Sequence, residues 1–83
     1  MDPRPGAPAV HVVVWNDAIN LMNYVTWVFR EVVGVAPDVA ETLMRAVHEE
    51  GHAVVRSADR ETCELLVADL HVFGLWATLE RGD

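Results

Sequence analysis

The spacing of apolar positions changes from strand-like to helix-like early in the chain. Residues 10–15 (Val-His-Val-Val-Val-Trp) are almost all β-branched or aromatic, which predicts a well-buried strand. After the polar pair Asn16-Asp17, apolar residues recur with helical spacing at Leu21, Val25, Val28, Phe29 and Val32. Gly34 then interrupts this pattern. The first half of the chain therefore predicts a strand followed by a helix.

The second half predicts two more helices and two more strands. Pro37 suits the first turn of a helix that we expect to end at Gly51. Residues 53–56 predict a short strand, Asp59 predicts the N-cap of a third helix, and residues 75–79 predict a last strand. The order β-α-α-β-α-β predicts an α+β fold, in which a small three-stranded antiparallel sheet packs against three helices.

Length and composition predict one small domain. The chain has 83 residues, of which 52% are apolar, so it can build a single compact core. Residues 1–9 contain three prolines and a glycine, and we expect a flexible arm there, before one domain over residues 10–83. No apolar run approaches the ~18–20 residues of a membrane span, and Cys63 is the one cysteine. Both features favour a cytoplasmic protein.

Charge excludes one class of partner. The formal net charge is −7, with thirteen acidic against six basic side chains, none of which is lysine. Such a surface repels phosphate backbones, and no basic cluster provides a local exception. We therefore expect no direct binding to nucleic acid.

Residues 48–52 (His-Glu-Glu-Gly-His) match the H-E-x-x-H pattern of zinc peptidases. That chemistry needs two imidazoles one helical turn apart on one metal, with the glutamate activating water. Gly51 favours the end of the helix, so we expect His52 to leave it, and no third ligand is evident nearby. A small zinc hydrolase that uses His48, Glu49 and His52 is the alternative hypothesis for this chain.

Four segments together resemble a known family. They are residues 15–17 (Trp-Asn-Asp), 20–25 (Asn-Leu-Met-Asn-Tyr-Val), 43–53 (Leu-Met-Arg-Ala-Val-His-Glu-Glu-Gly-His-Ala) and 75–80 (Leu-Trp-Ala-Thr-Leu-Glu). In this order they resemble the ClpS family, and in particular its actinobacterial branch. The resemblance extends from residue 10 to residue 80.

The resemblance implies an adaptor of the N-end rule rather than an enzyme, with no catalytic residue, cofactor or metal. ClpS proteins bind substrates that begin with Phe, Tyr, Trp or Leu and deliver them to a Clp AAA+ unfoldase–peptidase. The expected partner is the N-terminal domain of a ClpA- or ClpC-type unfoldase, and we expect a cytoplasmic monomer that binds no membrane. A plain interaction module that has kept the fold and lost the pocket is a third hypothesis.

The resemblance also implies a site for the N-terminal amine of the substrate. An ammonium carries three N–H donors and needs several converging acceptors, with a negative charge nearby. Asn16 offers a carbonyl oxygen, Asp17 a carboxylate, and neutral His48 a ring nitrogen. The family binds the amine with the residues at the positions of Asn16 and His48. A second acid often follows in the family, whereas this chain has Ala18, so Asp17 is the only acid of the loop.

Two further sets of positions follow from the same resemblance. The apolar pocket for the first side chain of the substrate falls on Ile19, Asn20, Met22, Val25, Met44, Val47 and Leu75. The residues Met44, Val47 and His48 have the spacing i, i+3, i+4, which places them on one face of a helix. Glu61 aligns with an acidic position on the helix that faces the unfoldase.

Overall fold

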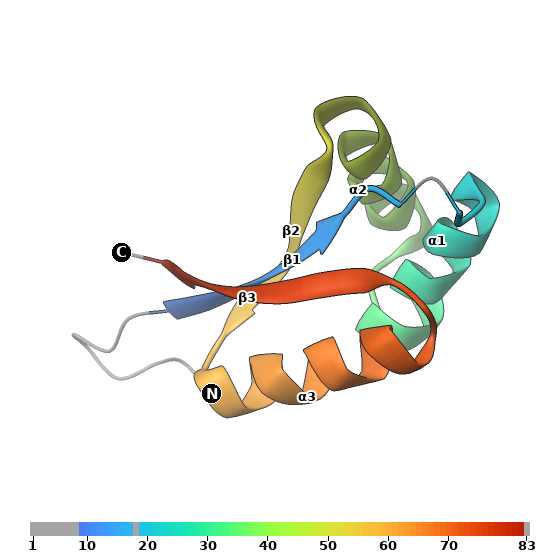
Figure 1. The fold of residues 1–83 in the computed structure, drawn as a ribbon. Helices are drawn as coiled ribbons and strands as arrows, with labels where there is room; N and C mark the ends of the chain where they lie inside the picture. Colours follow the sequence, from blue (N-terminus) through green and yellow to red (C-terminus); the bar gives the residue numbers. More distant parts are fainter. Residues whose placement is uncertain (1–8, 18, 83) are drawn as a thin grey trace.

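The computed structural model describes residues 9–17 and 19–82, and its elements follow the order β-α-α-β-α-β (Figure 1). The strands are β1 (Ala9–Trp15), β2 (His52–Ala58) and β3 (Trp76–Gly82). The helices are α1 (Met22–Val28), α2 (Pro37–Glu50) and α3 (Arg60–Val72). The predicted fold class is confirmed. Residues 1–8 of the predicted arm lie outside the described residues, as does Ala18, and Ala9 is the first residue of β1.

The sheet has the order β2-β1-β3, and the central strand β1 is antiparallel to both neighbours. The register between β1 and β2 shifts between Val12 and Val13, where Val55 is an additional residue on β2. Beyond this bulge, Trp15 pairs with His52 on one side and with Trp76 on the other. The end of β1 and the beginnings of β2 and β3 therefore meet at one end of the sheet.

The core combines alternate residues of β1 with apolar residues of every helix. Val12 and Val14 are buried against Phe29 and Leu70, which are fully enclosed. Figure 1 shows α3 running along the sheet, with α1 and α2 near the end where β1 stops.

Cys63 on α3 is buried, as predicted, and its thiol donates to the carbonyl oxygen of Val10 at 3.4 Å. Burial raises the pKa of this thiol.

The helices end where local signals predict, with one difference. The predicted first helix divides into α1 and a turn of π-helix, η1 (Phe29–Val33), which continues directly from it. Gly34 closes this turn with φ 87°, and the N–H groups of Gly34 and Val35 both donate to the carbonyl oxygen of Phe29. Asp59 is the N-cap of α3, as predicted, because its side chain accepts the N–H of Thr62. No helix among the described residues is long and apolar enough to cross a membrane.

Gly51 separates α2 from β2. Its left-handed conformation, with φ 92°, ends the helix, and β2 begins at the next residue. His48 therefore lies on α2 and His52 on β2, so His52 leaves the helix as predicted, and the two imidazoles do not share one helix face. Within residues 9–17 and 19–82, no three His, Cys, Asp or Glu side chains are grouped to hold a metal ion.

Candidate functional site

A cavity of about 360 Å³ lies where the loop after β1 meets α1 and α2. Its volume is within the usual range for small-ligand sites, about 300–1,000 Å³. The lining consists of Val14, Trp15, Asn16, Asp17, Asn20, Leu21, Met22, Val25, Met44, Val47, His48 and Leu75. All the positions that the sequence predicted for the amine site and the pocket are in this lining, except Ile19. The side chain of Ile19 is 88% exposed.

A backbone contact joins the two polar parts of the cavity. The N–H of Asn16 donates to the carbonyl oxygen of Gly51 at 2.9 Å, and the N–H of Gly51 donates to the carbonyl oxygen of Val47 at 3.0 Å. These bonds bring the loop against the last turn of α2, which carries His48. Asn16 and His48 are both exposed and line the same cavity, although they are far apart in the sequence.

Asp17 shapes the loop and supplies its negative charge. Its Oδ1 accepts the N–H of Ile19 at 2.9 Å, and its carbonyl oxygen accepts the N–H of Asn20 at 3.2 Å. This is the local turn that an Asp side chain commonly makes with the backbone two residues later. The hydrogen bond from Ile19 is made to Oδ1 of the carboxylate.

The apolar wall comes from three elements. Met22 and Val25 belong to α1, and Met44 and Val47 share one face of α2. Leu75, which is 4% exposed, closes the wall from the turn before β3.

Two side-chain bonds fix the turn before β3 in place. The side-chain amide of Asn20 donates to the carbonyl oxygen of Gly74 at 3.0 Å. The hydroxyl of Tyr24 donates to the carbonyl oxygen of Phe73 at 2.5 Å. Both bonds attach this turn to the loop and to α1. Asn20 therefore positions Leu75 as well as lining the cavity.

Three residues of the lining, Val14, Trp15 and Leu21, were not predicted from the sequence. The indole N–H of Trp15 donates to the hydroxyl of Thr78 at 2.8 Å. Its ring lies 5.2 Å from that of His52 and 5.9 Å from that of Trp76, between centroids. Trp15 and Leu21 directly precede Asn16 and Met22, and this adjacency is the signal that could have placed both at the cavity.

The chemistry of the cavity suits a ligand with two unlike parts. At one end the amide of Asn16, the carboxylate of Asp17 and the imidazole of His48 offer acceptors. The rest of the lining is largely apolar. A cationic amine that carries an apolar side chain on the next atom matches both parts. Glu61, on the first turn of α3, is exposed and lies outside this lining.

Comparison with known proteins gives one consistent family. The model of the family described as ATP-dependent Clp protease adaptor protein ClpS matches residues 6–78. The ClpS adapter protein of Streptomyces coelicolor is 48% identical over 79 residues, which cover 95% of this chain and 81% of that protein. The ClpS adapter protein of Corynebacterium diphtheriae is 49% identical over 70 residues, which cover 84% of this chain but only 62% of the relative.

A solved structure is also similar. The structure of Agrobacterium tumefaciens ClpS2 bound to L-phenylalaninamide has a TM-score of 0.85 and 25% sequence identity to this chain. The superposition covers 89% of this chain and 96% of that one.

Proposed function

This chain belongs to the ClpS family of ATP-dependent Clp protease adaptors, and we propose that it binds proteins with a free N-terminal Phe, Tyr, Trp or Leu and delivers them to a Clp AAA+ unfoldase–peptidase. The observation that carries this proposal is the cavity, in which acceptors at one end adjoin an apolar wall. In this role the chain makes and breaks no covalent bond. It acts by recognition alone, in the cytoplasm, where the unfoldase works.

The polar end receives the α-amino group. Its three N–H donors go to the side-chain oxygen of Asn16, the carboxylate of Asp17 and the neutral ring of His48. The negative charge of the Asp17 carboxylate balances the positive charge of the ammonium. An internal peptide bond has one donor and no charge, so it cannot replace a free N-terminus.

The apolar wall selects the first side chain. Burying a Phe or Leu side chain contributes about 1.5–3 kcal/mol, which corresponds to roughly 10- to 150-fold in affinity over a side chain that stays exposed. Such a side chain contacts the flexible, unbranched side chains of Met22 and Met44 and the smaller side chain of Val47. L-phenylalaninamide, the ligand named for the Agrobacterium ClpS2 structure, has the same free amine and apolar side chain.

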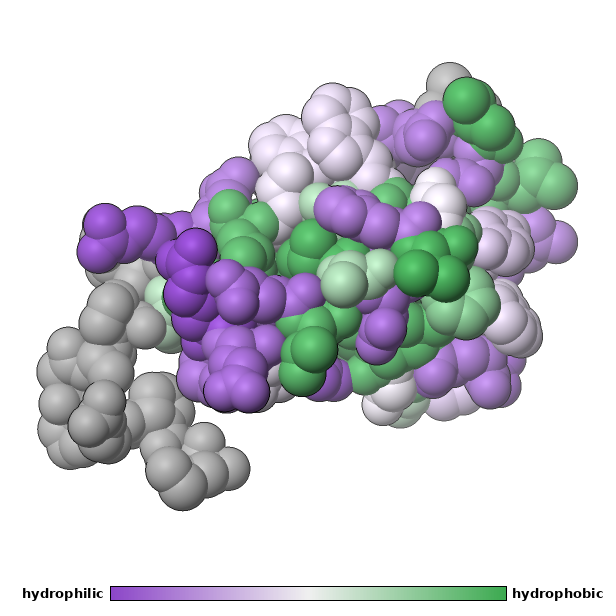
Figure 2. Space-filling view, turned by 60° about the horizontal axis from the view of Figure 1, so that its bottom comes forward, coloured by the Kyte–Doolittle hydropathy of each residue, from purple (hydrophilic) through white to green (hydrophobic). Residues whose placement is uncertain are grey.

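Delivery needs a second surface, and α3 offers one. Glu61 lies in the first turn of α3. Figure 1 shows that α3 begins at the opposite end of the sheet from α1. Figure 2 shows apolar side chains among polar ones on the face to which α3 belongs. On that helix, Leu65 is 64% exposed and Val72 is 82% exposed. We assign this face, with Glu61, to the contact with the unfoldase, which leaves the cavity free for the substrate.

The proposal is tested by titrating peptides that differ only in the first residue. We expect Phe, Tyr, Trp and Leu to bind at least tenfold more tightly than Ser, Asp or Lys. The same chain should accelerate degradation of a reporter with N-terminal Phe by a Clp unfoldase–peptidase. Equal affinity for all first residues would contradict the proposal. It would favour an interaction module that has kept the fold without the pocket.

A further inference from the structure

A second and larger hollow, of about 830 Å³, lies between α1 and α2. It is lined by Leu21, Met22, Asn23, Thr26, Trp27, Arg30, Glu41 and Met44, and we call it the α1–α2 groove. We propose that the substrate residues that follow the first one lie in this groove, and that Arg30 favours an acidic side chain at the fourth or fifth position. This inference rests on the proposed function, because it extends the same binding site along the substrate.

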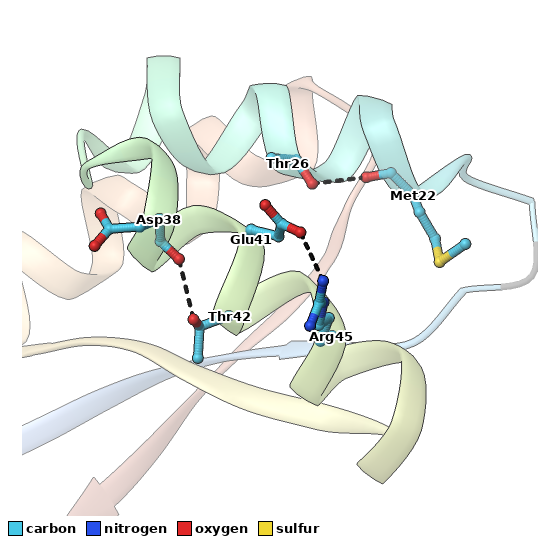
Figure 3. A network of polar contacts seen from close by, with 6 residues as sticks. All are labelled: Met22, Thr26, Asp38, Glu41, Thr42 and Arg45. Atoms are coloured by element: carbon cyan, nitrogen blue, oxygen red, sulfur yellow. Dashed lines mark hydrogen bonds and ion pairs between the residues drawn. The ribbon is translucent and has the colours of Figure 1, made fainter.

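The groove is continuous with the cavity for the first residue. Leu21, Met22 and Met44 line both hollows. In Figure 3, the side chain of Met22 extends from the start of α1, while Thr26 on α1 and Glu41 on α2 lie between the two helices. A peptide whose first side chain fills the cavity can therefore pass over Met22 directly into the groove.

The length of the groove sets which substrate positions reach its far end. Arg30 follows Met22 by eight positions, and a helix rises about 1.5 Å per residue, so the two lie roughly 12 Å apart along the helix. An extended peptide advances about 3.3 Å per residue. Three or four residues beyond the first therefore span this distance, which brings the fourth or fifth residue to Arg30.

The middle of the groove offers a fixed aromatic surface. Trp27 is 45% exposed, and its ring stacks on Tyr24 at 6.1 Å and lies 5.9 Å from Phe73. The bond from the hydroxyl of Tyr24 to the carbonyl oxygen of Phe73 holds this cluster together. A ring fixed before binding loses little conformational entropy when a substrate side chain packs on it.

The charge at the far end is positive. Glu41, the one acid of the lining, is paired with Arg45 at 2.8 Å. Arg30 has no ion-pair partner within residues 9–17 and 19–82. Its guanidinium is thus available for a charge-assisted hydrogen bond to a carboxylate. This local charge is opposite in sign to the net charge of −7.

The test uses peptides that begin with Phe and have one Glu as their only charged side chain, moved stepwise from position 2 to position 7. Isothermal titration calorimetry at 0.15 M salt should give about two- to five-fold tighter binding with Glu at position 4 or 5 than with Gln there. Lys at the same position should weaken binding. Arg30→Gln should remove this preference, and Arg30→Glu should reverse it in favour of Lys.

Matched controls separate the groove from general charge effects. Arg81→Glu makes the same charge change on the exposed end of β3 and should leave the preference unchanged. Phenylalaninamide, which cannot reach Arg30, should bind the wild type and Arg30→Glu equally. A preference that survives Arg30→Glu, or that Arg81→Glu also abolishes, would overturn the inference. If phenylalaninamide fails to bind the wild type, the proposed function itself fails and the groove proposal with it.

Discussion

The backbone N–H of Asn16 donates to the carbonyl oxygen of Gly51, and this 2.9 Å bond joins the two parts of the candidate amine site. Asn16 begins the loop after β1, whereas Gly51 directly follows the last turn of α2, which carries His48. The contact exists because Gly51 adopts φ 92°, which turns the chain out of the helix. The relative position of Asn16 and His48 thus depends on a glycine that lies outside the lining of the cavity.

Gly51→Ala should therefore affect both stability and binding. Among the described residues other than its chain neighbours, nothing lies within 4 Å of the added Cβ, so the cost is backbone strain, about 1–2 kcal/mol in the free energy of unfolding. We expect urea denaturation to show this loss and titration to show a several-fold weaker affinity for a Phe peptide.

Gly34→Ala is the matched control, because Gly34 has φ 87° and the same free space around its Cβ but lies outside the cavity lining. Gly34→Ala should lose a similar free energy of unfolding and bind the Phe peptide with the affinity of the wild type. Equal affinities in both variants would mean that Gly51 does not set the site geometry.

Peptide binding should weaken as pH falls from 7.5 to 5.5, because His48 is proposed to act as an acceptor. The neutral ring presents a nitrogen lone pair to the ammonium, whereas a protonated ring would present a donor and a positive charge. The substrate amine binds to the neutral ring of His48, so protons compete with the substrate and its affinity declines as pH falls. Protonation of the peptide amine, near ~8, would change affinity in the opposite direction.

His48→Gln separates these effects, because its side-chain carbonyl accepts a hydrogen bond but does not titrate. We expect it to retain part of the affinity at pH 7.5 and to lose the decline toward pH 5.5. A wild-type affinity that is constant over this range would show that His48 does not accept from the amine.

Met22 should exclude β-branched first residues. It lines both the cavity and the α1–α2 groove, and so lies where the first residue of the substrate enters. A Cβ with two heavy atoms is stiff and wide at that point. Met22→Ala should admit peptides that begin with Ile or Val while Leu and Phe still bind, as measured by fluorescence anisotropy. If the wild type already binds Ile as tightly as Leu, Met22 does not restrict the entrance.

Asp59 should make the stability of the fold depend on pH in the acid range. Hydrogen bonds from the hydroxyl of Thr62, at 2.6 Å, and from its backbone N–H, at 3.1 Å, lower the pKa of the Asp59 carboxyl. Because the pKa of Asp59 is lower in the folded state than in the unfolded state, the ionised carboxylate stabilises the fold at pH values above the ordinary pKa of an aspartate. This stabilisation is lost as pH falls through the pKa of the folded state. Asp59→Ala should lower the melting temperature by a few degrees at pH 7 and by less toward pH 3.

Asp59→Asn, which keeps a neutral capping oxygen, should melt close to the wild type at pH 3. Circular dichroism melts give these values. The interpretation of Asp59 as a charged cap would be wrong if Asp59→Ala lowered the melting temperature equally at pH 3 and pH 7.

The element order could be predicted because its signals are local. The β-branched run of β1, the glycine after α2 and the cap at Asp59 each act within a few residues of their own position. The start of β2 at His52 could not be predicted, because it depends on pairing with Trp15 across the sheet. The π-helical turn was missed for a similar reason. Its apolar residues repeat like those of an ordinary helix, and Phe29 and Val33 face the core in either form.

Most residues that line the candidate site could be predicted, but the contacts that hold them together could not. Resemblance to a family gave Asn16 and His48, and the cavity brings both together. No sequence pattern gives the bond from Asn16 to Gly51 or the bond from Asn20 to the turn before β3. These contacts join segments that are distant in the chain. The resemblance to the family predicted Ile19 in the pocket, whereas its side chain is exposed beyond the turn at Asp17.

The central claim, that the cavity binds a free N-terminal amine beside an apolar side chain, is tested most directly by acetylation. A fluorescently labelled peptide that begins with Phe is titrated with the protein, alongside the same peptide with an acetylated N-terminus. Acetylation removes the charge and two of the three donors that Asn16, Asp17 and His48 are proposed to receive. We expect the free peptide to bind and the acetylated peptide to lose at least tenfold in affinity. Equal anisotropy curves for the two peptides would contradict the claim.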